Sequence, residues 1–131
     1  MPSRLLILAV LGIVAMFTVA ACSEETAAQP VQKVAASDAV EMLDDRVVID
    51  VRTPAEYAAG HVAGALNIDV EGQDFAASIE ELDKDASYLV YCRSGRRSAI
   101  AAEQMADAGF TDIADAGGLA ELAEAGAPLE A

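Results

Sequence analysis

One of the two cysteines lies in a short segment rich in arginine and glycine, Tyr91-Cys92-Arg93-Ser94-Gly95-Arg96-Arg97-Ser98. The residues before Cys92 predict a buried strand, and those from Ser98 onward predict a helix. A helix N-terminus presents unpaired N–H groups and a partial positive charge. Gly95 lets the backbone curl so that successive amides face one centre. A thiol in this setting has its pKa lowered by roughly 1–5 units, so we expect Cys92 to be a thiolate nucleophile at neutral pH.

The positive charges of this acidic chain are concentrated near that segment. After position 21 there are seven basic and 22 acidic residues, a formal charge of −15. Four of the seven basic residues are Arg52, Arg93, Arg96 and Arg97. This concentration favours a site for a small anion, whereas the overall charge repels nucleic acid, which we do not expect as a partner. The alternative is a surface arginine cluster that offsets acidic neighbours, with Cys92 an inert buried thiol.

Strand and helix patterns alternate along the rest of the chain. Strands are expected at 31–35, 46–51, 65–68, 87–91 and 110–114, and helices at 37–45, 53–60, 74–82, 98–108 and 119–125. This alternation predicts an α/β fold: a small open, mostly parallel sheet of about five strands with helices on both faces. Sites in such sheets form at the carboxyl ends of strands, where Asp50, Arg52 and Cys92 should share one edge.

The first residues have the layout of an export signal. Arg4 precedes an uncharged apolar run at 5–21, and Val19-Ala20-Ala21-Cys22 is similar to a bacterial lipobox, in which the cysteine is acylated. We therefore expect a lipoprotein signal peptide at 1–21, a flexible tether at 22–32 and one domain at 33–131. The protein would be exported and held at the membrane by lipid on Cys22, facing the periplasm. A secretory signal without lipid, or an uncleaved membrane anchor, remains the alternative.

Several segments together resemble the rhodanese-like domain family. The segments 48–57 and 60–68 look like its first signature, 91–98 looks like its active-site loop, and 108–110 with Gly117-Gly118 match the region beyond. The resemblance covers about residue 31 to the C-terminus. One departure is Leu122, which stands where the family often has a tryptophan that packs in the core.

The resemblance implies a sulfurtransferase. Cys92 would take the sulfane sulfur of thiosulfate or a persulfide, release sulfite in the case of thiosulfate, and pass the sulfur to cyanide or a thiol by double displacement. The loop residues Arg93, Ser94, Gly95, Arg96 and Arg97 would bind substrate, with Arg93 and Arg97 as the cationic contacts. Asp50 and Arg52 would brace the loop. No cofactor or metal is implied, and a protein thiol as acceptor stays open.

Three other functions are less favoured by this sequence. Phosphatases with a Cys-x5-Arg loop are disfavoured because Ser98 stands where the arginine would be. A non-catalytic sulfur carrier or small-anion-binding module in the cell envelope is the main alternative, and a thiol redox sensor is a third.

The only histidine, His61, is expected to make structural hydrogen bonds rather than to activate Cys92.

Overall fold

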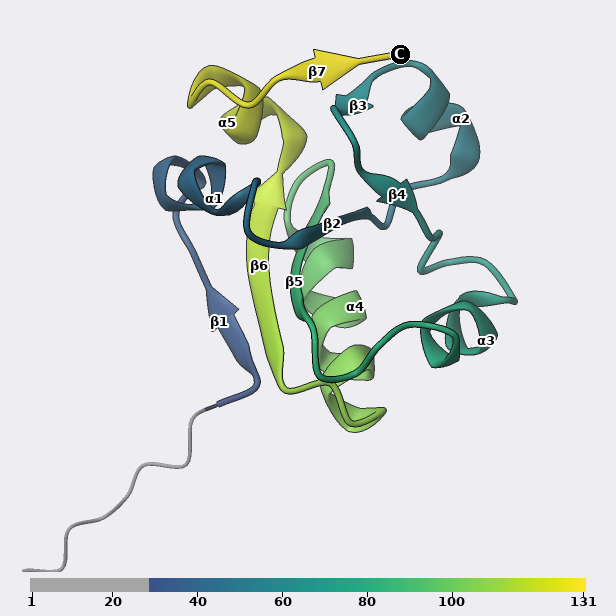
Figure 1. Ribbon diagram of the computed structural model, residues 1–131. Helices are drawn as coiled ribbons and strands as arrows, with labels where there is room; N and C mark the ends of the chain where they lie inside the picture. Colours follow the sequence, from purple (N-terminus) through teal and green to yellow (C-terminus); the bar gives the residue numbers. More distant parts are fainter. Residues whose placement is uncertain (1–28) are drawn as a thin grey trace, which may run out of the picture.

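Five short segments lie side by side as parallel strands in the computed structural model, which describes residues 29–131 (Figure 1). The strands are β1 (Val31–Lys33), β2 (Val47–Asp50), β4 (Leu66–Asn67), β5 (Ser87–Cys92) and β6 (Asp112–Gly118), and their order in the sheet is β1-β6-β5-β2-β4. Every neighbouring pair is parallel. The carboxyl ends of β2 and β5 are therefore adjacent, with Asp50 in register with Tyr91.

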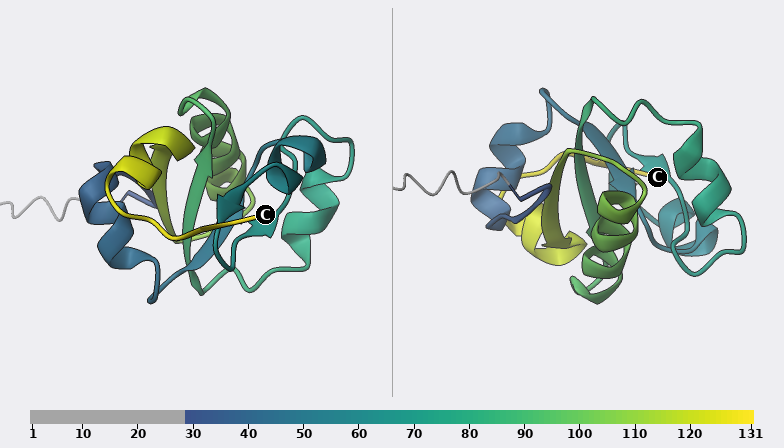
Figure 2. Two further views of the ribbon diagram at one scale, coloured as in Figure 1. Left: turned by 90° about the horizontal axis from the view of Figure 1, so that it is seen from above. Right: turned by 90° about the horizontal axis from the view of Figure 1, so that it is seen from below.

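Helices cover both faces of this sheet (Figure 2). They are α1 (Ala36–Met42), α2 (Pro54–Ala58), α3 (Phe75–Glu80), α4 (Arg96–Asp107) and α5 (Leu119–Glu124). On one face, α3 and α4 bury Phe75 and Met105 against β5 and its neighbours, and on the other α1 and α5 bury Ala39 and Leu122. Leu122 has no exposed surface, so it fills a core position. The predicted fold class is confirmed.

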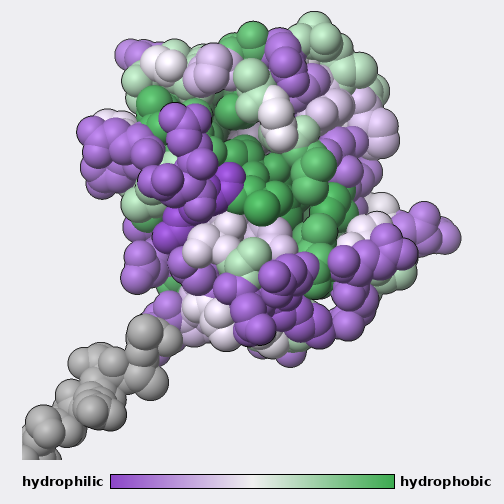
Figure 3. Space-filling model, viewed as in Figure 1, coloured by the Kyte–Doolittle hydropathy of each residue, from purple (hydrophilic) through white to green (hydrophobic). Residues whose placement is uncertain are grey.

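A second, two-stranded sheet was not predicted. β3 (His61–Val62) pairs antiparallel with β7 (Leu129–Glu130), which brings the C-terminus to the edge where β2 and β5 end. Two-residue strands show no periodicity in a sequence, and this pairing joins segments far apart in the chain. On the face seen in Figure 3, apolar residues gather in the middle of the view and hydrophilic residues surround them.

Some predicted boundaries differ from those in the structure. The last strand of the main sheet runs over Asp112–Gly118 rather than 110–114, because pairing with β5 and β1 overrides the low strand propensity of its Asp, Ala and Gly residues. Helix α4 begins at Arg96, two residues before Ser98. The strand expected at 31–35 is present as β1, over Val31–Lys33.

The expected signal peptide at 1–21, the lipidated Cys22 and the tether up to residue 28 lie outside the described residues. Between residues 29 and 131, no helix is long and apolar enough to span a bilayer.

Candidate active site

Cys92 is the last residue of β5, and its sulfur is held by backbone amides. The side chain has no exposed surface, and its Sγ accepts a hydrogen bond from the Gly95 N–H at 2.9 Å. Burial alone would raise the pKa of the thiol. Hydrogen bonds from the amide and hydroxyl of Ser98, and from the amides of Ser94 and Gly95, outweigh burial and lower the pKa of Cys92 below its ordinary value. The structure thus favours the thiolate.

Two glycines allow the backbone to place these amides around the sulfur, an arrangement called the cradle below. Gly95 precedes α4 with a φ of 93°, a left-handed conformation that a side chain disfavours, and it turns its N–H toward the sulfur. Gly118, at the end of β6, passes so close to the loop that a Cβ there would lie 2.6 Å from the Arg93 carbonyl oxygen. The Gly95 and Gly118 positions therefore fix how the loop closes over Cys92.

The three loop arginines do not form one cluster around the sulfur. Arg97 donates from both terminal nitrogens to the Glu56 carboxylate, at 2.7 and 2.9 Å. Arg93 and Arg96 are exposed, and neither has a side-chain hydrogen bond or ion pair within residues 29–131. The amides and the Ser98 hydroxyl contribute most to lowering the pKa of Cys92, and the charge of Arg97 adds to their effect. A direct contact of Arg97 with substrate stays a prediction, and the ion pair with Glu56 weighs against it.

Glu56 joins helix α2 to the active-site loop. It completes a capping box with Thr53, whose amide and hydroxyl both donate to Oε2. The Arg97 guanidinium, together with these hydrogen bonds from Thr53, lowers the pKa of Glu56 to about 2. The same ion pair raises the pKa of Arg97, and the negative charge of Cys92 adds to that rise. The sequence did not predict the partner of Arg97.

Asp50 and Arg52 form a buried ion pair at the end of β2, and the role of bracing the loop that was expected of them stays a prediction. The Asp50 carboxylate is fully buried and accepts hydrogen bonds from the amide and side chain of Arg52, including one of 2.7 Å. Arg52 also donates to the Gly60 carbonyl oxygen at 2.6 Å. The Tyr91 hydroxyl donates to Asp50 at 2.8 Å. This network holds the residue before Cys92 against the neighbouring strand end.

A buried pair behind the loop was missed by the sequence reasoning. The Ser98 hydroxyl lies 2.7 Å from Oδ1 of Asp115, and Gly117 donates its N–H to the same oxygen at 3.2 Å. Both side chains are buried, and the Ser98 hydroxyl is one of the groups that lower the pKa of Cys92. Asp115 therefore orients a residue that contacts the sulfur. The sequence feature that could have predicted this role is the position of Asp115 near the end of a strand that finishes in Gly-Gly.

His61 plays the structural part that was expected of it. Its Nδ1 lies 2.8 Å from the Tyr57 carbonyl oxygen, its Nε2 lies 3.3 Å from Glu130, and its ring stacks on that of Tyr57.

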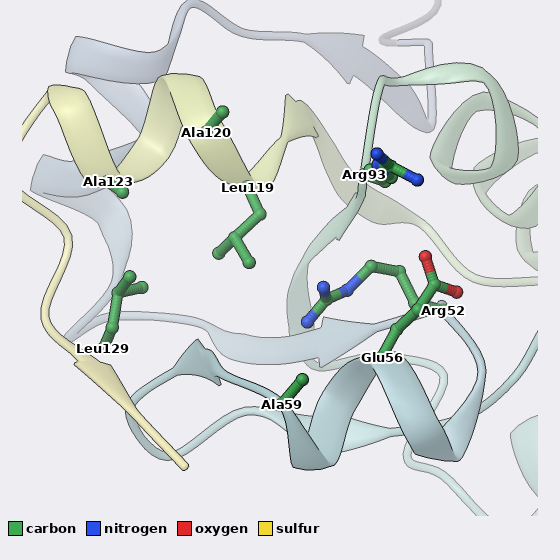
Figure 4. A pocket seen from close by; sticks show the side chains of 8 residues that line it. All are labelled: Arg52, Glu56, Ala59, Arg93, Leu119, Ala120, Ala123 and Leu129. Atoms are coloured by element: carbon green, nitrogen blue, oxygen red, sulfur yellow. The ribbon is translucent and has the colours of Figure 1, made fainter.

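A cavity of about 420 Å³ lies beside the loop, between α2, α5 and β7 (Figure 4). Its charged lining residues are Arg52, Glu56 and Arg93. The remaining lining residues are apolar: Ala59, Leu119, Ala120, Ala123 and Leu129. Cys92 is not one of the lining residues, but its neighbour Arg93 is. The cavity is therefore next to the candidate nucleophile without exposing it.

Comparisons with known proteins agree with this geometry. The family model described as rhodanese-like domain matches residues 35–125. The chain is 39% identical over 75 residues to thiosulfate sulfurtransferase PspE of Escherichia coli, covering 57% of this chain and 72% of that protein. It is 39% identical over 84 residues to thiosulfate sulfurtransferase GlpE of Pseudomonas putida, covering 64% and 74%.

Solved structures of the same family share the fold. The rhodanese-like domain of the Anabaena protein Alr3790 superimposes with a TM-score of 0.68 at 26% identity, covering 75% of this chain and 77% of that one. A rhodanese-related protein of Thermoplasma volcanium gives a TM-score of 0.67 at 30% identity, covering 76% and 97%.

Proposed function

Because the chain belongs to the rhodanese-like domain family, we propose that it is a sulfurtransferase that carries sulfur as a persulfide on Cys92. The observation that supports this most is the cradle around Cys92: the Gly95 amide donates to the sulfur, and the pKa of the thiol is lowered. A thiolate is the form that attacks a sulfane sulfur. The same amides suit the negative charge that a persulfide carries.

The reaction proceeds in two displacements. The Cys92 thiolate attacks the outer sulfur of thiosulfate, a new S–S bond forms, the S–S bond of thiosulfate breaks, and sulfite leaves with the electron pair. An acceptor such as cyanide or a thiolate then attacks the outer sulfur of the persulfide. That step gives thiocyanate or a new persulfide and restores the Cys92 thiolate.

Loop residues have distinct parts in this proposal. The amides of Ser94 and Gly95 hold the sulfur, and Arg93 and Arg96 are the exposed cations that attract the anionic donor. Since Cys92 has no exposed surface, the loop must move aside for the donor to reach the sulfur. Arg97 acts chiefly by tying the start of α4 to Glu56.

Intact mass of the full chain after incubation with thiosulfate tests the proposal. Wild type should gain the mass of one sulfur atom and lose it again when cyanide is added. Cys22→Ser should behave in the same way, whereas Cys92→Ser should gain nothing. Persistent loading without release to cyanide or any thiol would favour the sulfur-carrier alternative. If wild type gains no sulfur, the proposed transferase function is wrong.

We further propose that the protein is exported and anchored by lipid on Cys22, with a signal peptide at 1–21 and the catalytic domain facing the periplasm. The lipobox-like sequence before Cys22 supports this. Metabolic labelling with a clickable fatty acid, followed by membrane fractionation, checks it. Cys22→Ser should lose both the label and the membrane association, and label retained in that variant would refute it.

A further inference from the structure

The His61 ring lies between two oxygen atoms that accept hydrogen bonds. Its Nδ1 lies 2.8 Å from the Tyr57 carbonyl oxygen, and its Nε2 lies 3.3 Å from Oε1 of Glu130. A neutral imidazole carries one N–H and can donate to only one of these oxygens, whereas the protonated ring carries two N–H groups. The geometry therefore fits a protonated His61, which forms an ion pair with Glu130.

Glu130 supplies the negative charge of this pair. The Gly64 N–H donates to the same oxygen, Oε1, at 3.0 Å. This hydrogen bond, opposed by desolvation and assisted by His61, lowers the pKa of Glu130 below its ordinary value. The carboxylate is therefore ionised over the range of about pH 5 to 8 in which histidine changes its charge. Within that range, the proton on His61 decides whether the ion pair exists.

The other titratable and charged groups near His61 have partners of their own. They are Tyr57 of α2, Asp50 and Arg52 at the end of β2, and Tyr91 of β5. The Tyr57 ring stacks on the imidazole with the ring centroids 3.6 Å apart. Arg52 is paired with Asp50, and the Tyr91 hydroxyl donates to the same carboxylate. Among residues 29–131, Glu130 is the one carboxylate that forms an ion pair with His61.

This ion pair lies in strand β7, which forms one wall of the cavity beside the active-site loop. Only two residues of β7 pair with β3, and the Pro128 carbonyl oxygen accepts one more hydrogen bond, from the Ala63 N–H at 2.8 Å. Leu129 of β7 lines the cavity, and Figure 4 shows it on the side opposite Arg93. With so few backbone contacts, one ion pair is a large part of what holds this wall in place.

We infer that β7 is a pH-sensitive strap: protonated His61 holds it against β3 through Glu130, and loss of that proton loosens the strap together with the cavity wall that carries Leu129. The direction follows from linkage. Stabilisation by a protonated base is present at low pH and is lost as the pH rises through the titration of that base. The strap therefore closes in mild acid and opens more often in mild alkali.

Exchange of the Ala63 amide with deuterium, followed by NMR on the full chain, measures how often the strap opens. This amide donates to Pro128, so it exchanges when β7 leaves β3. After correction for the intrinsic pH dependence of exchange, opening should become about two- to fivefold more frequent between pH 5.5 and pH 8.5, the range expected for a partly exposed ion pair. The Ile113 amide, which donates to the Pro30 carbonyl oxygen in the main sheet, is the reference and should not follow this change.

Variants assign the effect to the ion pair. Glu130→Gln removes the charge but keeps an oxygen for the Gly64 amide. It should open about two- to fivefold more often than wild type at pH 5.5 and equally often at pH 8.5. His61→Phe keeps an aromatic ring against Tyr57 and should open equally often at both pH values. Glu124→Gln is the matched control, because it removes an exposed charge from α5 that makes no hydrogen bond or ion pair with His61, and it should behave as wild type.

The experiment requires no turnover, so its result is independent of the proposed function. Equal opening of the strap at both pH values in wild type would overturn the inference. A pH dependence that persists in both His61→Phe and Glu130→Gln would overturn it as well, and so would a Glu124→Gln variant that opens as often as Glu130→Gln at pH 5.5.

Discussion

The ion pair between Glu56 and Arg97 should stabilise the domain measurably, because it ties α2 to the first turn of α4. The pair is bidentate, and the side chains are only 28% and 17% exposed. Glu56→Gln is the informative change. Glutamine keeps an oxygen for the capping box with Thr53, so the substitution removes mainly the charge.

The pKa of Glu56 sets the scale of the effect. Its fall from 4.5 to about 2 corresponds to at most about 3.4 kcal/mol at ~1.4 kcal/mol per pKa unit. Partial exposure to solvent screens the pair, so we expect Glu56→Gln to lose about 1–2 kcal/mol of unfolding free energy at pH 7. Because the pKa is lower in the folded state than in the unfolded state, this stabilisation is present above pH 4.5 and is lost as the pH falls toward 2.

Urea unfolding at pH 7 and pH 3 measures both points. The difference between wild type and Glu56→Gln should shrink to less than half of its pH 7 value at pH 3. Glu80→Gln is the control, since its ion pair with Lys84 is exposed and should contribute little. A Glu56→Gln variant as stable as wild type at pH 7, or a difference that does not depend on pH, would refute the reasoning.

Three further outcomes are expected at the active site. Alkylation of Cys92 in a Cys22→Ser background should reach half of its maximal rate below pH 9, because hydrogen bonds lower the thiol pKa, and Ser98→Ala should move that midpoint upward. An alkylation rate profile with its midpoint at or above pH 9 would contradict the role of these hydrogen bonds in lowering the thiol pKa. Asp115→Ala should lose about 1–3 kcal/mol of unfolding free energy, measured in urea, because the Ser98 hydroxyl and the Gly117 amide lose the buried carboxylate oxygen that they share. Asp115→Asn keeps an oxygen at this position and should lose less; equal losses would disprove the role assigned to Asp115. Gly118→Ala should lower kcat for sulfur transfer about tenfold or more, since its Cβ would push against the Arg93 carbonyl that closes the loop, and an unchanged kcat would show that the loop tolerates the displacement.

Much of the fold was predictable from local features. The β-branched run that became β2, the apolar run that became β5 and the cap at Thr53 depend on neighbours within a few residues, so the sequence displays them directly. The position of Cys92 at the same sheet edge as Asp50 also followed, because parallel strands all end at one edge of a sheet.

The partners of the charged and polar side chains were not predictable in this way. Arg97 pairs with Glu56, 41 residues away, and Ser98 with Asp115, 17 residues away. The sequence shows three arginines near a cysteine. It does not show which carboxylate forms an ion pair with which arginine. That choice depends on how α2 and α4 approach each other once the sheet has formed.

By itself, the sequence determined the α/β layering, the strand end that delivers Cys92 and the glycine that lets amides face it, because these follow from short-range periodicity and backbone freedom. Only the tertiary structure decided that amides rather than guanidinium groups hold the sulfur, that β7 joins β3, and that an apolar cavity opens beside Arg93. Each of these requires segments distant in the chain to meet at close range, and packing in three dimensions, not local propensity, sets those distances.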